Sequence, residues 1–530
     1  LMAVGNEDWV VITPEGLFDA SPGAMEDLYF VVGMEIVPLE QLKSRYWDPH
    51  LLAKVMGFSE EERLKAPALT NVNLYPDIKA RIENDQLKVE LTAQGSGGLG
   101  KLSLFVNGKQ LLEDANPGKK SSLSIDLKPY WGWCFPGEDS STVALQAVSE
   151  GWLSSPLYSL RYLPSASGKG QNSGNNTTGN PQNLNEDPPS LYAVIIGTSQ
   201  YAGAEMKLTF PDVDAERFHD ALQVAGKGLF NERVRLKLLS STGTAPAALA
   251  TKANIKAAFE EFEKKAQPQD VFMVFFSGHG KTLGAAEKSK FYYLTKDIKA
   301  WSDLENPQLL AQNTISSDEI IGWLKKNKAA KQVLILDACN AASLGQQFGA
   351  AGKGMTSAQI RVADEMKNLT GTYILAGAAG DKESFEAPRY GQGLLTYSLL
   401  DGMRGEVRGT DNKVDILKLI NYACSKVPKL AGSIGKTQEP EMFLPKNAKG
   451  GFFIGIVTSP EQIMLPKAMP VIVRNNLFDP NTGNDDLGLT KVLKETLWEK
   501  MSSKIVYYDT DEYPDAYRIT GPYKTEGDVV

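Results

Sequence analysis

The amino-acid sequence predicts an α/β domain, a mostly parallel sheet sandwiched by helices, preceded by an all-β sandwich and followed by a small α+β unit. Three observations predict this order. Short runs of alternating polarity occupy residues 71–164, whereas continuous apolar runs alternate with helical patterns over residues 191–459. Between them, residues 165–190 replace nearly every large apolar residue with Gly, Ser, Asn and Pro, which is typical of a flexible linker.

Composition limits the functions that the chain can have. Its 530 residues are enough for three or four domains. The chain has 56 Lys and Arg residues against 64 Asp and Glu residues, a net charge of −8, which argues against nucleic acid as a general partner. No apolar run approaches the roughly 18 residues of a membrane-spanning helix, and the opening LMAVGNEDWV lacks the pattern of a signal peptide. We therefore expect a cytoplasmic protein without a membrane contact.

The all-β region shows five runs of alternating polarity separated by turn residues, as in an immunoglobulin-like sandwich. These runs are LKVELTAQ, KLSLFVNGKQL, SLSIDL, TVALQAV and LYSLRYL. Cys134 lies among aromatic residues in WGWCFPG, where a packed thiol is expected. Before this region, residues 1–70 mix strand and helix patterns without a motif. No residue in either region indicates chemistry.

The α/β region alternates strands with helices. The expected strands are LYAVIIG, VRLKLL, DVFMVFF, QVLILD, TYILAGA and GFFIGIV, and the expected helices include VDAERFHDALQVAG, TKANIKAAFEEFEKKA and SSDEIIGWLKKN. Ser316 and Glu319 predict a capping box at the start of the last of these helices. Because runs such as VFMVFF carry no polar alternation, we expect central parallel strands covered on both faces. Residues 460–530 return to a mixed pattern that predicts a small, incomplete α+β unit.

Two of these strands lead directly into residues that can do chemistry. The strand VFMVFF is followed by SGHG, which carries His279, and the strand QVLILD by ACNA, which carries Cys339. Functional groups of an open α/β sheet gather at the carboxyl ends of its strands. A thiol with a pKa near 8.5 is only a few per cent ionised at neutral pH, and a neighbouring imidazole can take its proton. The two strand ends therefore predict a Cys/His dyad, with the N–H groups of Gly280 and Cys339 as candidate donors to an oxyanion.

The remaining cysteines and histidines are weaker candidates. Cys424 shares an apolar helical stripe with Ile416 and Ile420, which is the position of a packed thiol. His219 lies within a helical pattern and His50 in a loop-like DPH. Three scattered cysteines cannot form a disulfide framework or a tetrahedral zinc site, so no metal site is predicted and a reducing compartment is expected. Taken singly, Cys339 also fits a core thiol and His279 a turn; only the pair favours chemistry.

The order and spacing of several motifs resemble those of the caspase-like cysteine peptidases, the superfamily of caspases, metacaspases and paracaspases. The motifs, which span about residues 190–458, are YAVIIGTSQYAG, LTFPDVDAERF, SGHG, LILDACNAAS and AAGDKESFEAPRYGQGLLTYSLLDGMRG. Animal caspases have Gln-Ala-Cys at the nucleophile, whereas this sequence has Asp337 two residues before Cys339. In this respect the sequence resembles metacaspases and paracaspases, and it is most similar to the bacterial type of these proteins.

The resemblance implies a cysteine endopeptidase with an acidic primary pocket. In metacaspases and paracaspases the Asp before the nucleophile and an Asp at the head of the first helix accept a basic side chain. Asp337 and Asp214 stand at these positions, and Ser277 matches a third lining residue; Glu386, or Glu383 beside it, is a further candidate. Two converging carboxylates offset the desolvation of Lys or Arg, and they disfavour cleavage after Asp. For Asp214, a carboxylate that stabilises a helix N-terminus explains the sequence equally well.

Three further expectations come from the resemblance and stay open. Maturation would cut the segment from Ser343 to Thr370, which contains Lys353, Arg361 and Lys367; part of it also predicts an amphipathic helix, which favours an uncut enzyme equally. Some metacaspases need calcium, but no EF-hand loop occurs here, so the sequence does not support calcium activation. The opening WVVITPEGLFDAS resembles the tail of a WD-repeat propeller, and this resemblance implies a longer chain with a partner-binding module before these residues.

The sequence thus predicts a cysteine endopeptidase without a required cofactor, whose substrate is a protein or peptide with Arg or Lys at the cleavage site. Cys339 would attack the carbonyl, and His279 would act as general base and then acid. Two alternatives remain: a catalytically silent scaffold with this fold, whose β-domains bind partner proteins, and a hydrolase of a non-peptide acyl substrate. No GxxxxGK[ST], HExxH or paired-Cys pattern occurs, so neither a phosphate-binding loop nor a metallohydrolase is predicted.

Overall fold

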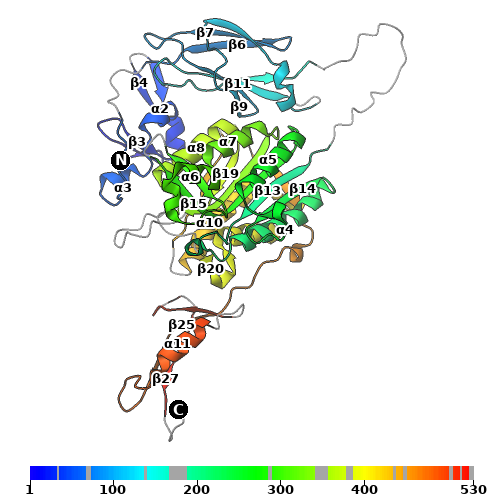
Figure 1. Ribbon diagram of the computed structural model, residues 1–530. Helices are drawn as coiled ribbons and strands as arrows, with labels where there is room; N and C mark the ends of the chain where they lie inside the picture. Colours follow the sequence, from blue (N-terminus) through cyan, green and yellow to red (C-terminus); the bar gives the residue numbers. More distant parts are fainter. Residues whose placement is uncertain are drawn as a thin grey trace.

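The computed structural model describes most of the chain. The described residues are 1–32, 35–66, 73–136, 140–165, 188–284, 289–340, 356–377, 386–433, 437–445, 450–499, 505–511, 513 and 516–524. Within them, an N-terminal unit, an antiparallel β region, a central α/β domain and a small C-terminal unit follow one another along the chain (Figure 1). Most of the predicted linker, residues 166–187, lies outside the described residues, and the domain boundaries stay predictions.

The central sheet is mostly parallel, as predicted. Its main path runs β14-β13-β15-β18-β19-β23; off this path, β16 pairs with β15 and β17 pairs with β16. The parallel strands are β13 (Leu191–Gly197), β14 (Val234–Ser240), β15 (Val271–Leu283), β18 (Lys331–Asn340) and β19 (Tyr373–Ala376). The antiparallel strands are β16 (Lys290–Leu294), β17 (Thr314–Ser316) and β23 (Glu441–Phe443).

Helices cover both faces of this sheet, and each face has its own hydrophobic core. One core contains residues of α4 (Pro211–Phe230), α9 (Leu394–Asp401) and α10 (Ile416–Gly432). The other contains residues of α5 (Lys252–Lys265), α7 (Ser317–Lys326) and α8 (Ser357–Thr370). The predicted capping box of α7 is present, with Ser316 and Glu319 bonded reciprocally. The central strands are therefore buried on both faces, as their continuous apolar runs predicted.

The structure differs from the expected strands at two points. The motif SGHG lies inside β15 and not after it, because β18 pairs with β15 as far as Gly280 and β16 continues the pairing to Leu283. The run GFFIGIV does not join the central sheet: β24 (Phe453–Ile456) pairs with β22 (Lys413–Asp415). Length and polarity cannot tell which partner a short strand takes.

The β region forms two antiparallel sheets that share one core. The first, in the order β10-β7-β6, contains β6 (Asp77–Glu83), β7 (Gln86–Thr92) and β10 (Ser122–Asp126). The second, in the order β12-β11-β8-β9, contains β8 (Leu102–Val106), β9 (Lys109–Leu112), β11 (Ser141–Ala147) and β12 (Tyr158–Tyr162). Buried residues of both sheets, Cys134 among them, pack in this core, and burial raises the pKa of the Cys134 thiol. The closer likeness to an immunoglobulin domain stays a prediction.

A buried lysine joins this β region to the α/β domain. Lys109 on β9 is 1% exposed, and its ammonium donates to the backbone carbonyls of Asn327 and Ala329. Asn327 is the C-cap of α7, where unpaired carbonyls and the helix dipole favour a cation. Burial holds the pKa of Lys109 well below its ordinary value. The contact therefore depends on hydrogen bonds to fixed carbonyls.

The C-terminal unit corrects the expected α+β arrangement. It contains β25 (Val471–Phe478), α11 (Leu489–Glu499), β26 (Val506–Tyr508) and β27 (Tyr517–Pro522). Both outer strands pair with β25 in parallel, so the unit has the parallel pairing of an α/β sheet. Alternating polarity in a short strand does not reveal the direction of its partner.

The N-terminal unit has two small antiparallel sheets and three short helices. The strands are β1 (Met2–Val4), β2 (Asp8–Ile12), β3 (Phe18–Ala20), β4 (Tyr29–Val32) and β5 (Glu35–Pro38), and the helices are α1 (Pro22–Asp27), α2 (Leu39–Tyr46) and α3 (Leu51–Val55). The relation of this unit to a WD-repeat propeller stays a prediction.

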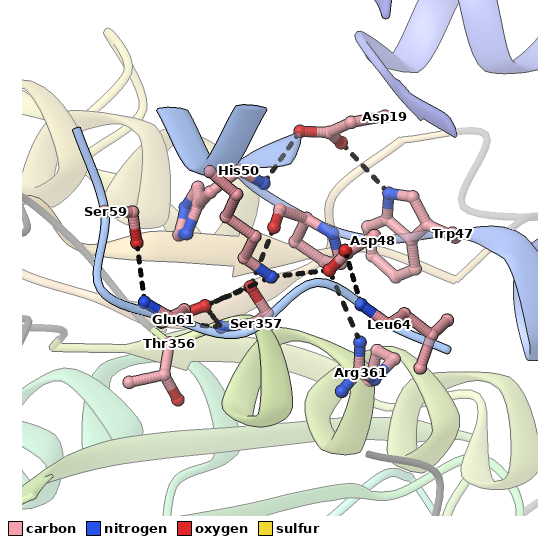
Figure 2. A network of polar contacts seen from close by, with 12 residues as sticks. Asp19, Trp47, Asp48, His50, Ser59, Glu61, Leu64, Thr356, Ser357 and Arg361 are labelled. Carbon is pink, nitrogen blue, oxygen red and sulfur yellow. Dashed lines mark hydrogen bonds and ion pairs between the residues drawn. The ribbon is translucent and has the colours of Figure 1, made fainter. Parts of the chain in front are cut away.

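A buried network of charges attaches this unit to the first turn of α8 (Figure 2). The Lys54 ammonium pairs with Asp48 and, at 3.3 Å, with Glu61. The Glu61 carboxylate accepts from the hydroxyl and the N–H of Ser357, the first residue of α8, where the helix dipole favours a negative charge. Arg361, one turn later, lies 4.0 Å from Asp48. The two units therefore meet through paired charges, of which Lys54 and Asp48 are buried and Glu61 is partly exposed.

This network predicts the effect of removing its central cation. In Lys54→Met, the buried carboxylate of Asp48 loses its close ion pair and keeps Arg361 at 4.0 Å and the Leu64 N–H, so the cost stays below the about 3–5 kcal/mol of a fully uncompensated buried charge. We expect faster proteolytic release of the N-terminal unit and a lower melting temperature. Lys491→Met, at a side chain that is 80% exposed, is the matched control and should leave both unchanged. Equal behaviour of the two variants would show that the network contributes nothing.

Candidate active site

The register of β15 and β18 brings the two predicted motifs side by side. The strands pair in parallel, with His279 opposite Cys339 and Ser277 opposite Asp337. The same register begins at Val271, and the odd-numbered residues of both strands pack in the core of α4, α9 and α10 as far as Phe275 and Ile335. Because side chains alternate along a strand, positions 277, 279 and 337 continue this row. The side chain of Cys339 lies outside the described residues.

The His279 ring is fixed by three neighbours that the sequence did not indicate. Its Nε2 lies 2.9 Å from the backbone carbonyl of Met206, and its backbone N–H donates to the Tyr201 hydroxyl at 2.8 Å. The rings of Tyr201 and Trp301 lie with their centroids 5.1 Å from that of the imidazole. A carbonyl only accepts, so Nε2 carries the proton, and in the neutral ring Nδ1 keeps its lone pair. The ring is therefore oriented as a base at Nδ1.

Burial keeps this imidazole neutral. His279 is 9% exposed, and desolvation lowers its pKa to about 4, against which the Met206 hydrogen bond acts only in part. Charging a buried imidazole costs hydration that the surrounding aromatic rings cannot replace. At neutral pH the ring is therefore unprotonated, and the same desolvation makes it a weaker base than a free imidazole.

The two positions of SGHG that hold glycine require it for different structural reasons. Gly278 has a φ of 147°, which disfavours other residues, and a Cβ there would lie 2.9 Å from the Tyr201 hydroxyl. At Gly280, a Cβ would lie 2.5 Å from the Phe291 ring. Gly280 is in register with Asn340 on one side and Tyr293 on the other. Close packing thus accounts for this glycine, and its predicted part in an oxyanion hole stays a prediction.

The predicted acidic residues converge. Asp214, in the first turn of α4, is 2% exposed, and Asp337, on β18, is 4% exposed. The Asp214 carboxylate accepts from the N–H of Gly393 at 2.9 Å and lies 3.5 Å from the Ser277 hydroxyl. Asp337 lies 3.4 Å from the hydroxyl of Thr396. The structure therefore brings together three of the four predicted pocket residues.

The start of α9 supports these two carboxylates. Gly393, the last residue of β21 (Gln392–Gly393), is the N-cap of α9, and Thr396 lies in the first turn. Helix N-termini favour negative charge, which offsets part of the cost of burying carboxylates. Arg217, one turn after Asp214 on α4, donates to the Gly391 carbonyl at 2.8 Å and to Gln392 at 2.6 Å. These contacts hold the hairpin that ends at Gly393 against α4.

Other sequence candidates fall outside this arrangement. Glu386 lies on β20 (Glu386–Ala387), but its side chain, like all of Glu383, lies outside the described residues. Cys424 packs beside the core of α10, and burial raises its pKa to about 11. His219 lies within α4, where its ring is 2.9 Å from the Asp220 carboxylate. Cys424 is therefore a packed thiol, and His219 lies within a helix, as the sequence predicted.

The segment predicted for maturation is only partly described. Residues 341–355, with Lys353, lie outside the described residues. The predicted amphipathic helix is α8, and it carries the other two basic residues. The Lys367 side chain is 10% exposed and pairs with Asp364, and that of Arg361 is 16% exposed. A protease binds its substrate in extended form, so neither position on α8 is open to cleavage while the helix is folded.

The described residues show neither a metal-binding cluster nor a helix that could span a membrane. No group of three or more His, Cys, Asp or Glu side chains there is arranged to hold a metal ion. In the same part of the chain, no helix combines the length and the apolar character that crossing a bilayer requires.

Several solved structures are similar to parts of this chain at low sequence identity. Caspase-1 from Spodoptera frugiperda is 12% identical, with a TM-score of 0.30, over 51% of this chain and 92% of its own. The spore cortex lytic enzyme SleM of Clostridium perfringens is 16% identical, with a TM-score of 0.13, over 22% of this chain and 38% of its own. A polysaccharide deacetylase from Bacillus cereus is 8% identical, with a TM-score of 0.13, over 56% of this chain and 78% of its own. Scores this low carry no argument about function.

The family comparison is informative where the structural ones are not. No curated protein matches the chain. The family model described as the caspase domain matches residues 190–449. This range contains the central sheet, both helical layers, and the motifs around His279 and Cys339. Residues 190–449 of this chain are therefore similar to the caspase domain over almost half of the chain.

Proposed function

We propose that this chain is a cysteine endopeptidase that cleaves after Arg or Lys, with Cys339 as nucleophile and His279 as base. One observation carries the proposal. Neighbouring parallel strands hold these two positions in register, and the imidazole donates its Nε2 proton to Met206, which leaves Nδ1 as an acceptor. A buried, oriented, neutral imidazole next to a thiol is the arrangement that activates a cysteine.

The proposed reaction uses this arrangement in two steps. Nδ1 takes the thiol proton as the sulfur attacks the peptide carbonyl, and the imidazolium then returns that proton to the leaving amine. The acyl-enzyme that remains is hydrolysed by a water that gives its proton to the same nitrogen. The Met206 carbonyl holds the ring in one tautomer throughout, and it stabilises the imidazolium that forms between the steps.

The acidic pair supports basic specificity. Asp214 and Asp337 are buried close to a common point beside Gly393, where two negative charges repel each other. A Lys or Arg side chain that enters between them is desolvated, and the two carboxylates replace its lost hydration. An acidic side chain would add a third negative charge. The silent-scaffold alternative offers no reason to collect a base and two carboxylates at one end of the sheet.

The nucleophile is tested by comparing two cysteine variants. We expect Cys339→Ala to lower kcat/KM on Arg peptides by at least about 1,000-fold, because the attacking atom is lost. Cys424→Ala is the control, since burial keeps its thiol protonated at neutral pH. An Arg-containing peptide electrophile should label the wild type and the control but not Cys339→Ala. Equal activity of all three proteins would favour the scaffold or a non-peptide substrate.

The pH dependence of the imidazole follows from its burial. The folded-state pKa of His279 is about 4 and the unfolded value is near 6.5. The unfolded state therefore takes up the proton first, so that this residue costs up to about 3 kcal/mol of stability as the pH falls from 6.5 to 4. We expect the urea-unfolding free energy of the wild type to fall more over this window than that of His279→Gln. The NMR signal of the His279 imidazole is assigned as the one that His279→Gln lacks. In the wild type we expect this signal to titrate near pH 4. Titration near pH 6.5 would contradict the buried base.

The acidic pocket predicts which substrates are affected by charge removal. Asp337→Asn and Asp214→Asn should each lower kcat/KM on Arg and Lys peptides by about 100-fold, because a desolvated cation loses one of its partners. Asp220→Asn, on the same helix as Asp214 but 78% exposed, is the control and should cleave normally. A wild-type preference for Asp or for neutral side chains, in a library of peptides that vary at the cleaved residue, would refute basic specificity.

A further inference from the structure

The edge of β15 that faces β13 has a gap in its strand pairing at His279. Pairing with β13 ends at Ser277, and pairing with β16 on the same edge begins at Gly280. Gly278 and His279 lie between these two pairings. A buried backbone N–H at such a gap needs another acceptor, because a buried donor without a partner is costly.

The Tyr201 hydroxyl fills this gap. It accepts the backbone N–H of His279 at 2.8 Å, and so takes the part that a strand carbonyl has elsewhere along β15. The ring of the same tyrosine lies against the imidazole, with the ring centroids 5.1 Å apart and the ring planes inclined by 33°. One buried side chain therefore holds the backbone of the base and covers its ring.

The loop between β13 and α4, residues 198–210, reaches His279 at two points. It carries Tyr201 and also Met206, whose carbonyl lies 2.9 Å from Nε2. The Ala202 N–H joins this loop to the Lys296 carbonyl at 2.8 Å. Tyr201 and Met206 belong to a small hydrophobic cluster, separate from the two cores of the sheet, whose other buried members are Leu294, Ile298 and Leu304. A shift of the loop would therefore move both contacts of the imidazole together.

A buried carboxylate that the proposed reaction does not use supports this loop. The Ser241 hydroxyl accepts the N–H groups of Ser199 and Gln200 at 3.0 and 2.8 Å. The same hydroxyl donates to the Asp212 carboxylate at 2.5 Å, and that carboxylate also accepts the Ser241 N–H at 2.8 Å. Asp212 lies in the first turn of α4 and is buried. These contacts fix the two residues directly before Tyr201.

We propose that Tyr201 is a positioning residue, whose hydroxyl and ring hold the His279 imidazole in the orientation that the proton transfer needs. This inference rests on the proposed function and adds to it a residue that acts only through the base. A misplacement of about 1 Å can lower the rate of an enzyme about 100-fold. Loss of the hydroxyl contact therefore lowers kcat and leaves substrate binding unchanged.

The test removes the hydroxyl and keeps the ring. In Tyr201→Phe, kcat on an Arg peptide should fall at least about tenfold with KM unchanged. The His279 NMR signal should still titrate near pH 4, because the phenyl ring covers the imidazole as before. Tyr373→Phe is the matched control and should keep the wild-type kcat. The Tyr373 hydroxyl is bonded to the Gly450 carbonyl at 2.7 Å, and its residue is 8% exposed, against 6% for Tyr201, but it begins β19 at the amino end of the strand. A wild-type kcat in Tyr201→Phe would overturn the inference.

A second variant decides the matter if Tyr201→Phe does not fold. Ser241→Ala leaves Tyr201 in place and removes the acceptor of the two loop N–H groups, so kcat should fall severalfold with KM unchanged. In that case an unchanged kcat would overturn the inference.

Alkylation of Cys339 by iodoacetamide separates this inference from the proposed function, because the reagent has no substrate side chain to place. The wild type should react faster at Cys339 than Tyr201→Phe, and equal rates would overturn the positioning role. If the wild type cleaves no peptide after Arg or Lys while Tyr201→Phe still slows this alkylation, the proposed function is wrong and the positioning of the base by Tyr201 stands.

Discussion

The parallel register of β15 and β18 is the constraint on which the site depends. It runs without a shift from Val271 opposite Lys331 to Gly280 opposite Asn340. A slip of one residue would turn every side chain of a strand to the opposite face. Phe275 would then leave the core of α4, α9 and α10, and Phe272 and Phe276 would leave the core of α5, α7 and α8. The apolar packing along the strands therefore fixes which polar residues meet at their ends.

Burial serves the chemistry at a cost to the fold. The same desolvation that keeps His279 neutral would oppose any positive charge on it, and the carboxylates of Asp214 and Asp337 are buried where like charges repel. These groups persist because fixed dipoles face them: the Met206 carbonyl for the imidazole, and the Gly393 N–H at the start of α9 for Asp214. Such preorganised partners do not need to reorient when charge moves, which is the main advantage of a polar site inside a protein.

The sequence predicted the elements of this site better than their contacts. Continuous apolar runs indicated buried parallel strands, and two strand ends with a thiol and an imidazole indicated where chemistry would lie. The hydrogen bond from His279 to Met206 joins residues 73 positions apart, and that from Gly393 to Asp214 joins residues 179 apart. No local pattern encodes such pairs, because a backbone carbonyl and a glycine have no side chain to mark them. Only Arg217, one helical turn after Asp214, offered a signal that spacing could have revealed.

The additional units contact the α/β domain at different places. The β region contacts Asn327 and Ala329, which directly precede β18, and therefore lies at the amino ends of the strands (Figure 1). The N-terminal unit binds Ser357 at the start of α8, the helix that runs back from the carboxyl ends toward the start of β19. His279 and the pocket carboxylates also lie at the carboxyl ends. The N-terminal unit is therefore attached at the start of α8, on the side of the sheet where the strands end.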